Sequence, residues 1–204
     1  MKTILIHASW SSGSSALTGY IHHCGFHACP PFFQPRDPKT PIAFENIDYR
    51  NALHAYVNIE KLAFSCNANS EQFETFFKSW HRQQIEIADN LNKEGLVLKH
   101  PLQIFALPII EKFCNPLHIV LTRQEEKIEA TRQRRKWPDV FGVKGAKIIY
   151  QKIHNHFDDS TDEPFLLSYD EFLSNKQVRE KLLQFCGLKS GQKKLREAEN
   201  FIRA

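Results

Sequence analysis

A run of small hydroxyl residues lies near the N-terminus, directly after a short apolar segment. Residues 3–8 have the apolar character of a buried strand, and residues 16–24 have the pattern of a helix. Backbone N–H groups at a helix N-terminus bind anions, and small side chains let a phosphate approach them closely. The intervening residues therefore predict either a phosphate-binding turn or a serine-rich turn that only caps the helix. The small residues of this turn are Ser11, Ser12, Gly13, Ser14, Ser15 and Ala16.

This turn lacks the signature of the loops that bind ATP in hydrolysing enzymes. That signature consists of Gly, four residues, Gly, Lys and then Ser or Thr. The turn at residues 10–17 has one glycine and no lysine. A conventional ATPase is therefore disfavoured.

A second anion-binding pattern occurs in the middle of the chain. Residues 117–122 predict a buried strand that is followed by Arg123, and Thr131 lies eight positions later in a predicted helix at residues 125–136. Ligands of open α/β sheets bind at the carboxyl ends of the strands. A guanidinium fork with a hydroxyl beside it suits a phosphate monoester. The alternative from these residues alone is an exposed arginine next to a solvated helix.

Strand patterns and helix patterns alternate along the chain. This alternation predicts an α/β fold with three layers, in which a mostly parallel central sheet is flanked by helices. The clearest helix is residues 70–93, with Ser70 as its expected N-cap and Gly95 as its expected terminator. Further strands are expected at residues 96–98 and 165–167, and further helices at residues 51–64, 102–113, 146–157, 178–186 and 193–202.

The length of 204 residues fits a single domain, which we expect to span residues 1–204. Residues 25–93 have the character of an insertion into it. Five prolines between positions 30 and 41 disfavour regular structure there, and the helix at residues 70–93 follows. We expect this Pro-rich and helical insertion to form a lid or the acceptor-binding part of a site.

Composition excludes several classes of protein. Hydrophobic residues make up 42% and charged residues 25%, which is typical of a globular chain rather than a disordered one. The formal net charge of +4 fits a modest anionic ligand and does not require a nucleic acid. Five cysteines without a CxxC pair, and no apolar run of about 18 residues, predict a cytoplasmic protein without a membrane span.

The ordered set of segments resembles the sulfotransferases that use 3′-phosphoadenosine 5′-phosphosulfate (PAPS). Residues 11–17 resemble that family's phosphosulfate loop, and residues 119–123 with Thr131 resemble its 3′-phosphate motif. The order and spacing agree from about residue 3 to residue 188. Three further segments resemble the family's "Leu-Lys-x-Pro" strand end, its "Tyr-Glu-Asp-Leu" segment and its "Leu-x-Phe-Leu-Gly-Leu" helix: residues 97–102, 167–173 and 182–188.

The resemblance implies a P-loop-like sulfotransferase fold and a reaction. The enzyme would move a sulfuryl group from PAPS, its co-substrate, to a hydroxyl or amine of a small-molecule or carbohydrate acceptor, with no metal. Arg123 and Thr131 would bind the 3′-phosphate, and Trp10 and Tyr169 are candidates for the wall against adenine. The phosphosulfate would bind to six residues of the turn, Ser11, Ser12, Gly13, Ser14, Ser15 and Ala16.

One position departs from the family pattern. The family usually carries Lys or Arg where this chain has Ser11, so the positive charge beside the leaving group must come from elsewhere. We expect Lys99, at the end of the second strand, to supply it. His100 is the expected general base, because histidine titrates near neutrality. The family's other type of base is a carboxylate, for which the candidates are Glu45, Asp48 and Glu60.

Two other functions stay open from the sequence. A nucleotide kinase-like enzyme on the same fold is disfavoured by the missing Gly-Lys-Ser/Thr, and a non-catalytic nucleotide-binding protein is favoured by Ser11. The His and Cys residues between positions 22 and 29 match no closed zinc pattern. The basic residues at positions 132–136 are either a solvated helix face or a surface that covers the cofactor.

Overall fold

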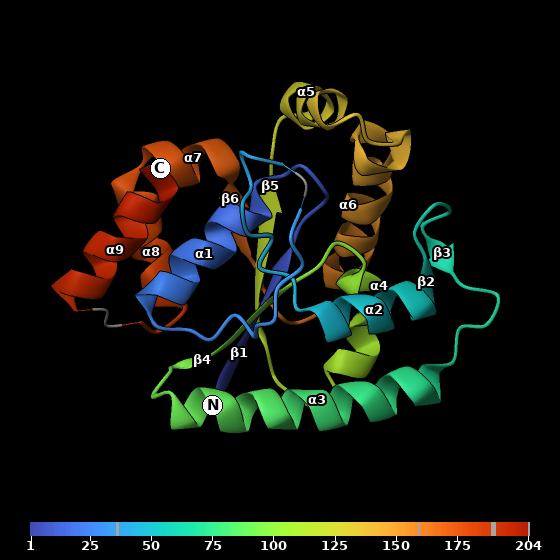
Figure 1. Ribbon diagram of the computed structural model, residues 1–204, viewed down its shortest axis with the longest axis horizontal. Helices are drawn as coiled ribbons and strands as arrows, with labels where there is room; N and C mark the ends of the chain where they lie inside the picture. Colours follow the sequence, from blue (N-terminus) through green and yellow to red (C-terminus); the bar gives the residue numbers. More distant parts are fainter. Residues whose placement is uncertain (36, 159, 189–190, 204) are drawn as a thin grey trace.

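The computed structural model describes residues 1–35, 37–158, 160–188 and 191–203. Its centre is a sheet of four strands in the order β4-β1-β5-β6, and every neighbouring pair is parallel (Figure 1). The predicted alternation of strands and helices is therefore confirmed at the level of an α/β fold with a parallel sheet. The strands are β1 (Lys2–His7), β4 (Gly95–Lys99), β5 (Leu117–Thr122) and β6 (Phe165–Ser168).

Helices cover both faces of the sheet. Figure 1 shows α1, α8 and α9 on one side and α4 and α6 on the other, which gives three layers. Along β1, Ile4 and Ile6 belong to the core on the α1 side, whereas Leu5 belongs to the core on the α4 side. The helices are α1 (Ser14–Cys24), α2 (Ile47–Tyr56), α3 (Ser70–Asn90), α4 (Gln103–Ile110), α5 (Glu125–Arg135), α6 (Val143–Asp158), α7 (Tyr169–Ser174), α8 (Lys176–Phe185) and α9 (Gln192–Arg203), with a 3₁₀ turn at Asp139–Phe141.

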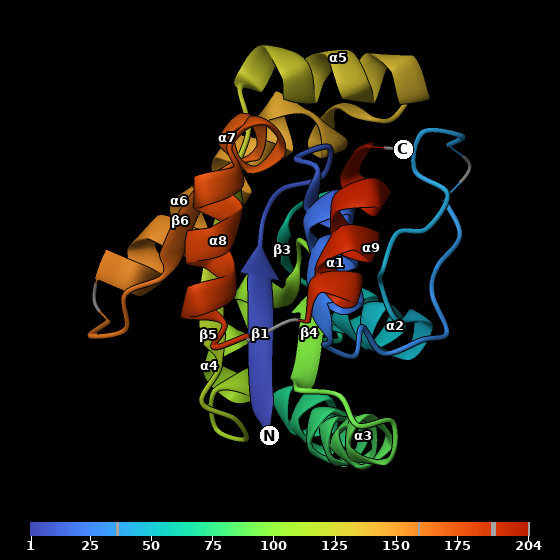
Figure 2. The same ribbon diagram turned by 90° about the vertical axis from the view of Figure 1, so that its left-hand side faces the viewer.

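The register of the sheet brings three carboxyl strand ends to one edge. Ile6 of β1 pairs with Lys99 of β4, and His7 of β1 pairs with Val120 of β5. The residues that follow these strands, including Arg123 after β5, therefore emerge beside the turn between β1 and α1. Figure 2 shows α5 above this edge.

The expected helix at residues 51–64 is wrong in its second half. α2 ends at Tyr56, and a short hairpin follows, formed by β2 (Val57–Asn58) and β3 (Ala63–Phe64). The side-chain oxygen of Asn58 accepts hydrogen bonds from the backbone N–H groups of Glu60 and Lys61. This side chain offers the backbone an alternative to helical hydrogen bonds and makes the turn.

α3 is confirmed, with different ends. Its N-cap is Asn69 rather than Ser70, since the Asn69 side chain accepts a hydrogen bond from the N–H of Gln72. It ends at Asn90, and Gly95 lies in β4 instead of terminating the helix. Phe73, Phe77, Trp80 and Ala88 of the helix are buried, whereas Leu91 follows the helix end and is 54% exposed.

Residues of the expected insertion contribute to the same core as the sheet. Leu53 of α2 and Phe77 and Trp80 of α3 are buried in one cluster with Leu98 of β4 and Ile149 of α6.

The sequence pattern does not predict α7, which follows β6 directly. In the ranges that the structure describes, no helix has both the length and the apolar character needed to cross a membrane.

The packing of α3 generates a stability prediction. Phe77 is completely buried, so Phe77→Ala should lower the free energy of unfolding by about 3–5 kcal/mol, because it removes apolar contacts and leaves a cavity. Phe76 is only half-buried on the same helix, so Phe76→Ala serves as the matched control. Urea unfolding followed by circular dichroism measures both, and equal losses would contradict this account of the core.

Candidate functional site

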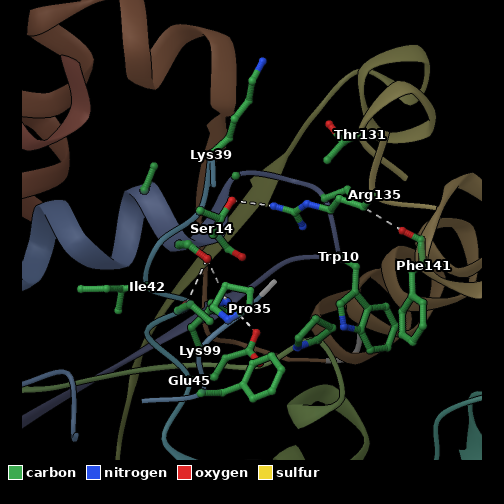
Figure 3. A pocket seen from close by; sticks show the side chains of 18 of the residues that line it. Trp10, Ser14, Pro35, Lys39, Ile42, Glu45, Lys99, Thr131, Arg135 and Phe141 are labelled. Carbon is green, nitrogen blue, oxygen red and sulfur yellow. Dashed lines mark hydrogen bonds and ion pairs between the residues drawn. The ribbon is translucent and has the colours of Figure 1, made fainter. Parts of the chain in front are cut away.

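A cavity of about 1040 Å³ lies at the carboxyl edge of the sheet (Figure 3). Its walls come from the β1–α1 turn, the Pro-rich segment, the end of β4, and α5. Of the ten residues predicted to form the site, Ser12 alone is not among those that line it. The predicted residues that do line it are Ser11, Gly13, Ser14, Ser15, Ala16, Lys99, His100, Arg123 and Thr131.

The β1–α1 turn is built on two residues with left-handed backbone conformation, Ser11 (φ 61°) and Gly13 (φ 89°). Ser12 is fully buried, and its hydroxyl donates a hydrogen bond to the carbonyl oxygen of Ser9 (2.7 Å). The Ser12 hydroxyl therefore stabilises the turn itself, and Ser12 does not line the cavity. At Gly13 an added Cβ would lie 2.2 Å from the Tyr169 ring, so both the conformation and the close approach require glycine.

The N-terminus of α1 opens towards this turn. The N–H groups of Ala16 and Leu17 donate to the Gly13 carbonyl oxygen, which closes the first turn of the helix. No side chain of the described residues caps this end. The first N–H groups and the positive end of the helix dipole thus remain able to bind an anion.

Arg123 joins the end of β5 to the turn and to α5. Its Nη1 donates hydrogen bonds to the carbonyl oxygen of Ser11 (2.8 Å) and to Oγ1 of Thr131 (3.3 Å). Its guanidinium lies over the Tyr169 ring, 4.9 Å from the centroid. Nε of Arg123 is buried and has no hydrogen-bond partner in the described part of the chain. The structure thus brings together the arginine, the hydroxyl and the turn that the sequence singled out.

Lys99 lies beside the same turn, as expected from its place at the end of β4. Its Nζ is 2.7 Å from Oε1 of Glu45 and 3.4 Å from the Ser15 hydroxyl. The side chains of Lys99 and Glu45 are only 4% and 11% exposed. Burial alone would raise the pKa of Glu45, but the positive charges of Lys99 and Arg50 outweigh it and lower the pKa below its usual value. Glu45 is therefore ionised and paired with Lys99.

The geometry of His100 does not suit the role of general base, so that expectation is corrected. Its ring is 1% exposed, and Nδ1 accepts a hydrogen bond from the backbone N–H of Leu102 (3.1 Å). Burial lowers the pKa of His100 to about 3, so the ring is neutral and carries its proton on Nε2. That nitrogen lies 3.9 Å from Oε2 of Glu45. Neither ring nitrogen has a free lone pair for the acceptor's proton.

Glu45 is the carboxylate that the structure places in the cavity. Asp48 and Glu60 are exposed and do not belong to its lining. Trp10 packs edge-on against Phe141 (4.9 Å between centroids), as Figure 3 shows, and its ring also lies edge-on to that of His100. Tyr169 instead packs on Arg123.

The cavity carries a large excess of positive charge. Glu45 is the one carboxylate among the described residues that line it, and a site of this composition favours a ligand with several negative charges. The sequence placed Arg134 and Arg135 in a basic run that is either a solvated helix face or a surface covering the cofactor, and it gave no signal for Arg50, which has no motif around it. The lining cations are Lys39, Arg50, Lys99, Arg123, Lys127, Arg134 and Arg135.

Two further observations bear on identity. The described residues contain no group of three or more His, Cys, Asp or Glu side chains that could hold a metal ion. The chain matches no family model and no curated protein.

The buried Lys99–Glu45 pair generates a pH-dependent prediction. Lys99→Met should lower the free energy of unfolding by about 3–5 kcal/mol at neutral pH, because it leaves the Glu45 carboxylate buried without its main counter-charge. In wild type the lowered pKa of Glu45 gives stability that is present above the pKa of the unfolded chain and lost as pH falls through the folded value. In the variant, burial without Lys99 raises that pKa, so acidification protonates Glu45 and relieves the loss.

Urea unfolding between about pH 8 and about pH 5 tests the direction of this pH dependence. The difference between wild type and Lys99→Met should shrink towards the acidic end. The double variant Lys99→Met/Glu45→Gln is the control, since it contains no buried charge at this position and should show a smaller loss that does not change with pH. A loss by Lys99→Met that is constant over the range would contradict the argument.

Proposed function

We propose that the cavity binds PAPS and that the protein transfers its sulfuryl group to a hydroxyl or amine of a small-molecule or carbohydrate acceptor. The observation that carries this proposal is the contact of Arg123 with both Thr131 and the β1–α1 turn. It supports two anion-binding positions in one cavity, one at the Arg123–Thr131 pair and one at the N-terminus of α1. A nucleotide with a 3′-phosphate and a 5′-phosphosulfate has its anionic groups at two such positions.

Arg123 and Thr131 would bind the 3′-phosphate. The guanidinium donates to the Thr131 hydroxyl, which itself donates to the carbonyl oxygen of Lys127, so the two groups are neighbours and a phosphate would take over these hydrogen bonds. Lys127 lines the same part of the cavity on α5. A fork of N–H donors with a hydroxyl distinguishes a phosphate monoester from a ribose hydroxyl, which favours PAPS over ATP.

The α1 N-terminus and Lys99 would act on the phosphosulfate. In the reaction the bond between sulfur and the bridging oxygen breaks, and its electron pair stays on the phosphate of the leaving 3′,5′-adenosine bisphosphate. The acceptor oxygen or nitrogen forms the new bond to sulfur. Negative charge grows on the bridging oxygen, so donors fixed near it stabilise the transition state. Lys99, beside Ser15, supplies the cation that Ser11 does not.

Glu45 would accept the acceptor's proton. In its pair with Lys99 the carboxylate is a weak base, because the ammonium lowers its pKa. When the phosphosulfate binds Lys99, that opposing charge is shared, and the burial of Glu45 raises its pKa towards that of a useful base. Cofactor binding and activation of the base would thus depend on the same lysine.

Calorimetric titration with 3′,5′-adenosine bisphosphate tests the nucleotide site. We expect micromolar binding that requires the 3′-phosphate, with 5′-AMP and ATP binding more weakly. Arg123→Ala should weaken it by about tenfold or more, because it removes a charge-assisted contact. Thr131→Ala should weaken it less. Arg82→Ala, on the exposed face of α3, is the matched control and should leave binding unchanged.

Equal affinity for nucleotides with and without the 3′-phosphate would contradict the proposal. Transfer from labelled PAPS to a panel of acceptors then separates the enzyme from a binding protein. Tight binding of the bisphosphate with no transfer to any acceptor would favour the non-catalytic alternative. Mg²⁺-dependent turnover of ATP would favour the kinase-like one.

A further inference from the structure

A Pro-rich strap, defined here as residues 33–35 and 37–43, forms one wall of the cavity. Pro35, Lys39 and Ile42 of the strap line the cavity together with Lys99 and Arg135 (Figure 3). The strap belongs to no helix or strand. Its prolines, at positions 35, 38 and 41, fix their own φ angles and restrict the residues before them, so the strap is stiff between its ends.

The base of the strap is fixed to the body of the protein by hydrogen bonds that involve the backbone. The N–H of Phe33 donates to the carbonyl oxygen of Glu45 (2.8 Å), and Phe32 and Asn46 form a bridge beside it. The Ser15 hydroxyl donates to the carbonyl oxygen of Ala43 (3.0 Å). The base therefore lies against the α1 side of the cavity, next to Glu45.

The tip of the strap is held to α5 by side chains. One Asp37 oxygen accepts from Nη1 of Arg134 (2.7 Å), and the other accepts from Nη2 of Arg134 (3.1 Å) and Nε of Arg135 (2.6 Å). Nη2 of Arg135 also donates to the Thr40 hydroxyl (2.6 Å). The Asp37 side chain is 3% exposed. We name Asp37 with Arg134 and Arg135 the latch.

We propose that the strap is a lid that closes over the bound nucleotide, and that it opens by breaking the latch while its base acts as the hinge. This inference rests on the proposed function. α5, which holds the tip, also carries Thr131. Arg123 lies in the connection between β5 and α5 and lines the same cavity. The latch thus connects the lid directly to the helix that would bind the 3′-phosphate.

The two ends of the strap differ in the way a lid requires. The base is tied through main-chain groups, whereas the tip depends on ion pairs in which Arg134 is 38% exposed. The tip is thus released when one of these side chains changes its partner, whereas release of the base requires main-chain hydrogen bonds to break.

Hydrogen exchange in the protein without nucleotide tests the latch alone. Asp37→Asn should speed exchange in residues 37–43 by about tenfold or more and leave α1 unchanged, because it removes the charge that both arginines bind. Asp48→Asn, an exposed carboxylate on α2, is the matched control and should change nothing in the strap. Arg134→Gln removes a latch partner on α5 and should also speed exchange in residues 37–43. Unchanged exchange in both latch variants would overturn the proposal.

Stopped-flow binding of 3′,5′-adenosine bisphosphate tests the lid. Trp10 lines the cavity and Trp137 lies under Arg135 of the latch (4.5 Å), so tryptophan fluorescence reports the event. Both the association and the dissociation rate constants should rise by about tenfold or more in Asp37→Asn, since opening limits both directions, while Asp37→Glu should restore values closer to wild type.

Rate constants equal to those of wild type in Asp37→Asn would overturn the lid. Absence of any binding to the wild-type protein would instead contradict the proposed function. In that case the exchange measurement still decides whether Asp37 keeps the strap closed.

Discussion

The arrangement of the site depends on one buried pair of opposite charges, Lys99 and Glu45. Neither group could stay ionised in the interior alone, because moving a charge out of water without a partner costs several kcal/mol, on the order of the whole stability of a domain. Lys99 is fixed by β4, and Glu45 follows the strap. Their pairing therefore requires the Pro-rich segment to lie across the carboxyl edge of the sheet, and Ser15 of the β1–α1 turn contacts the same lysine.

The other cations near the cavity follow the same rule of pairing. Arg123 donates to a carbonyl oxygen and a hydroxyl, and Arg134 and Arg135 surround Asp37. A polyanionic ligand that binds here would therefore replace the protein groups that these arginines now contact. Such exchange links binding to movement, since Asp37 lies in the strap and Glu45 lies two residues after its end. Binding of the ligand, closure of the strap and activation of Glu45 as a base would then all follow from the same exchange of ion-pair partners.

The sequence was sufficient where local pattern determines structure. The buried run at residues 117–122 and the polar helix after it were predicted almost to the residue, and Lys99 was expected near the turn because parallel strands align their ends. It was insufficient where distant segments meet. No residue near Asp37 predicts its contact with two arginines almost a hundred positions later in the chain. The environment of His100 likewise depends on Glu45, which is distant in the sequence, and on the N–H of Leu102. Asn58 ended a predicted helix through its own side chain, a local effect that periodicity does not capture.

A crystal structure of the protein with 3′,5′-adenosine bisphosphate tests the central claim most directly. The account predicts density for the 3′-phosphate within hydrogen-bond distance of Arg123 and Thr131, and for the 5′-phosphate at the N-terminus of α1 near Lys99. The Lys99–Glu45 contact should lengthen as the lysine turns to the ligand. Density for the nucleotide outside this cavity, or bound in it with neither phosphate at these positions, would contradict the account.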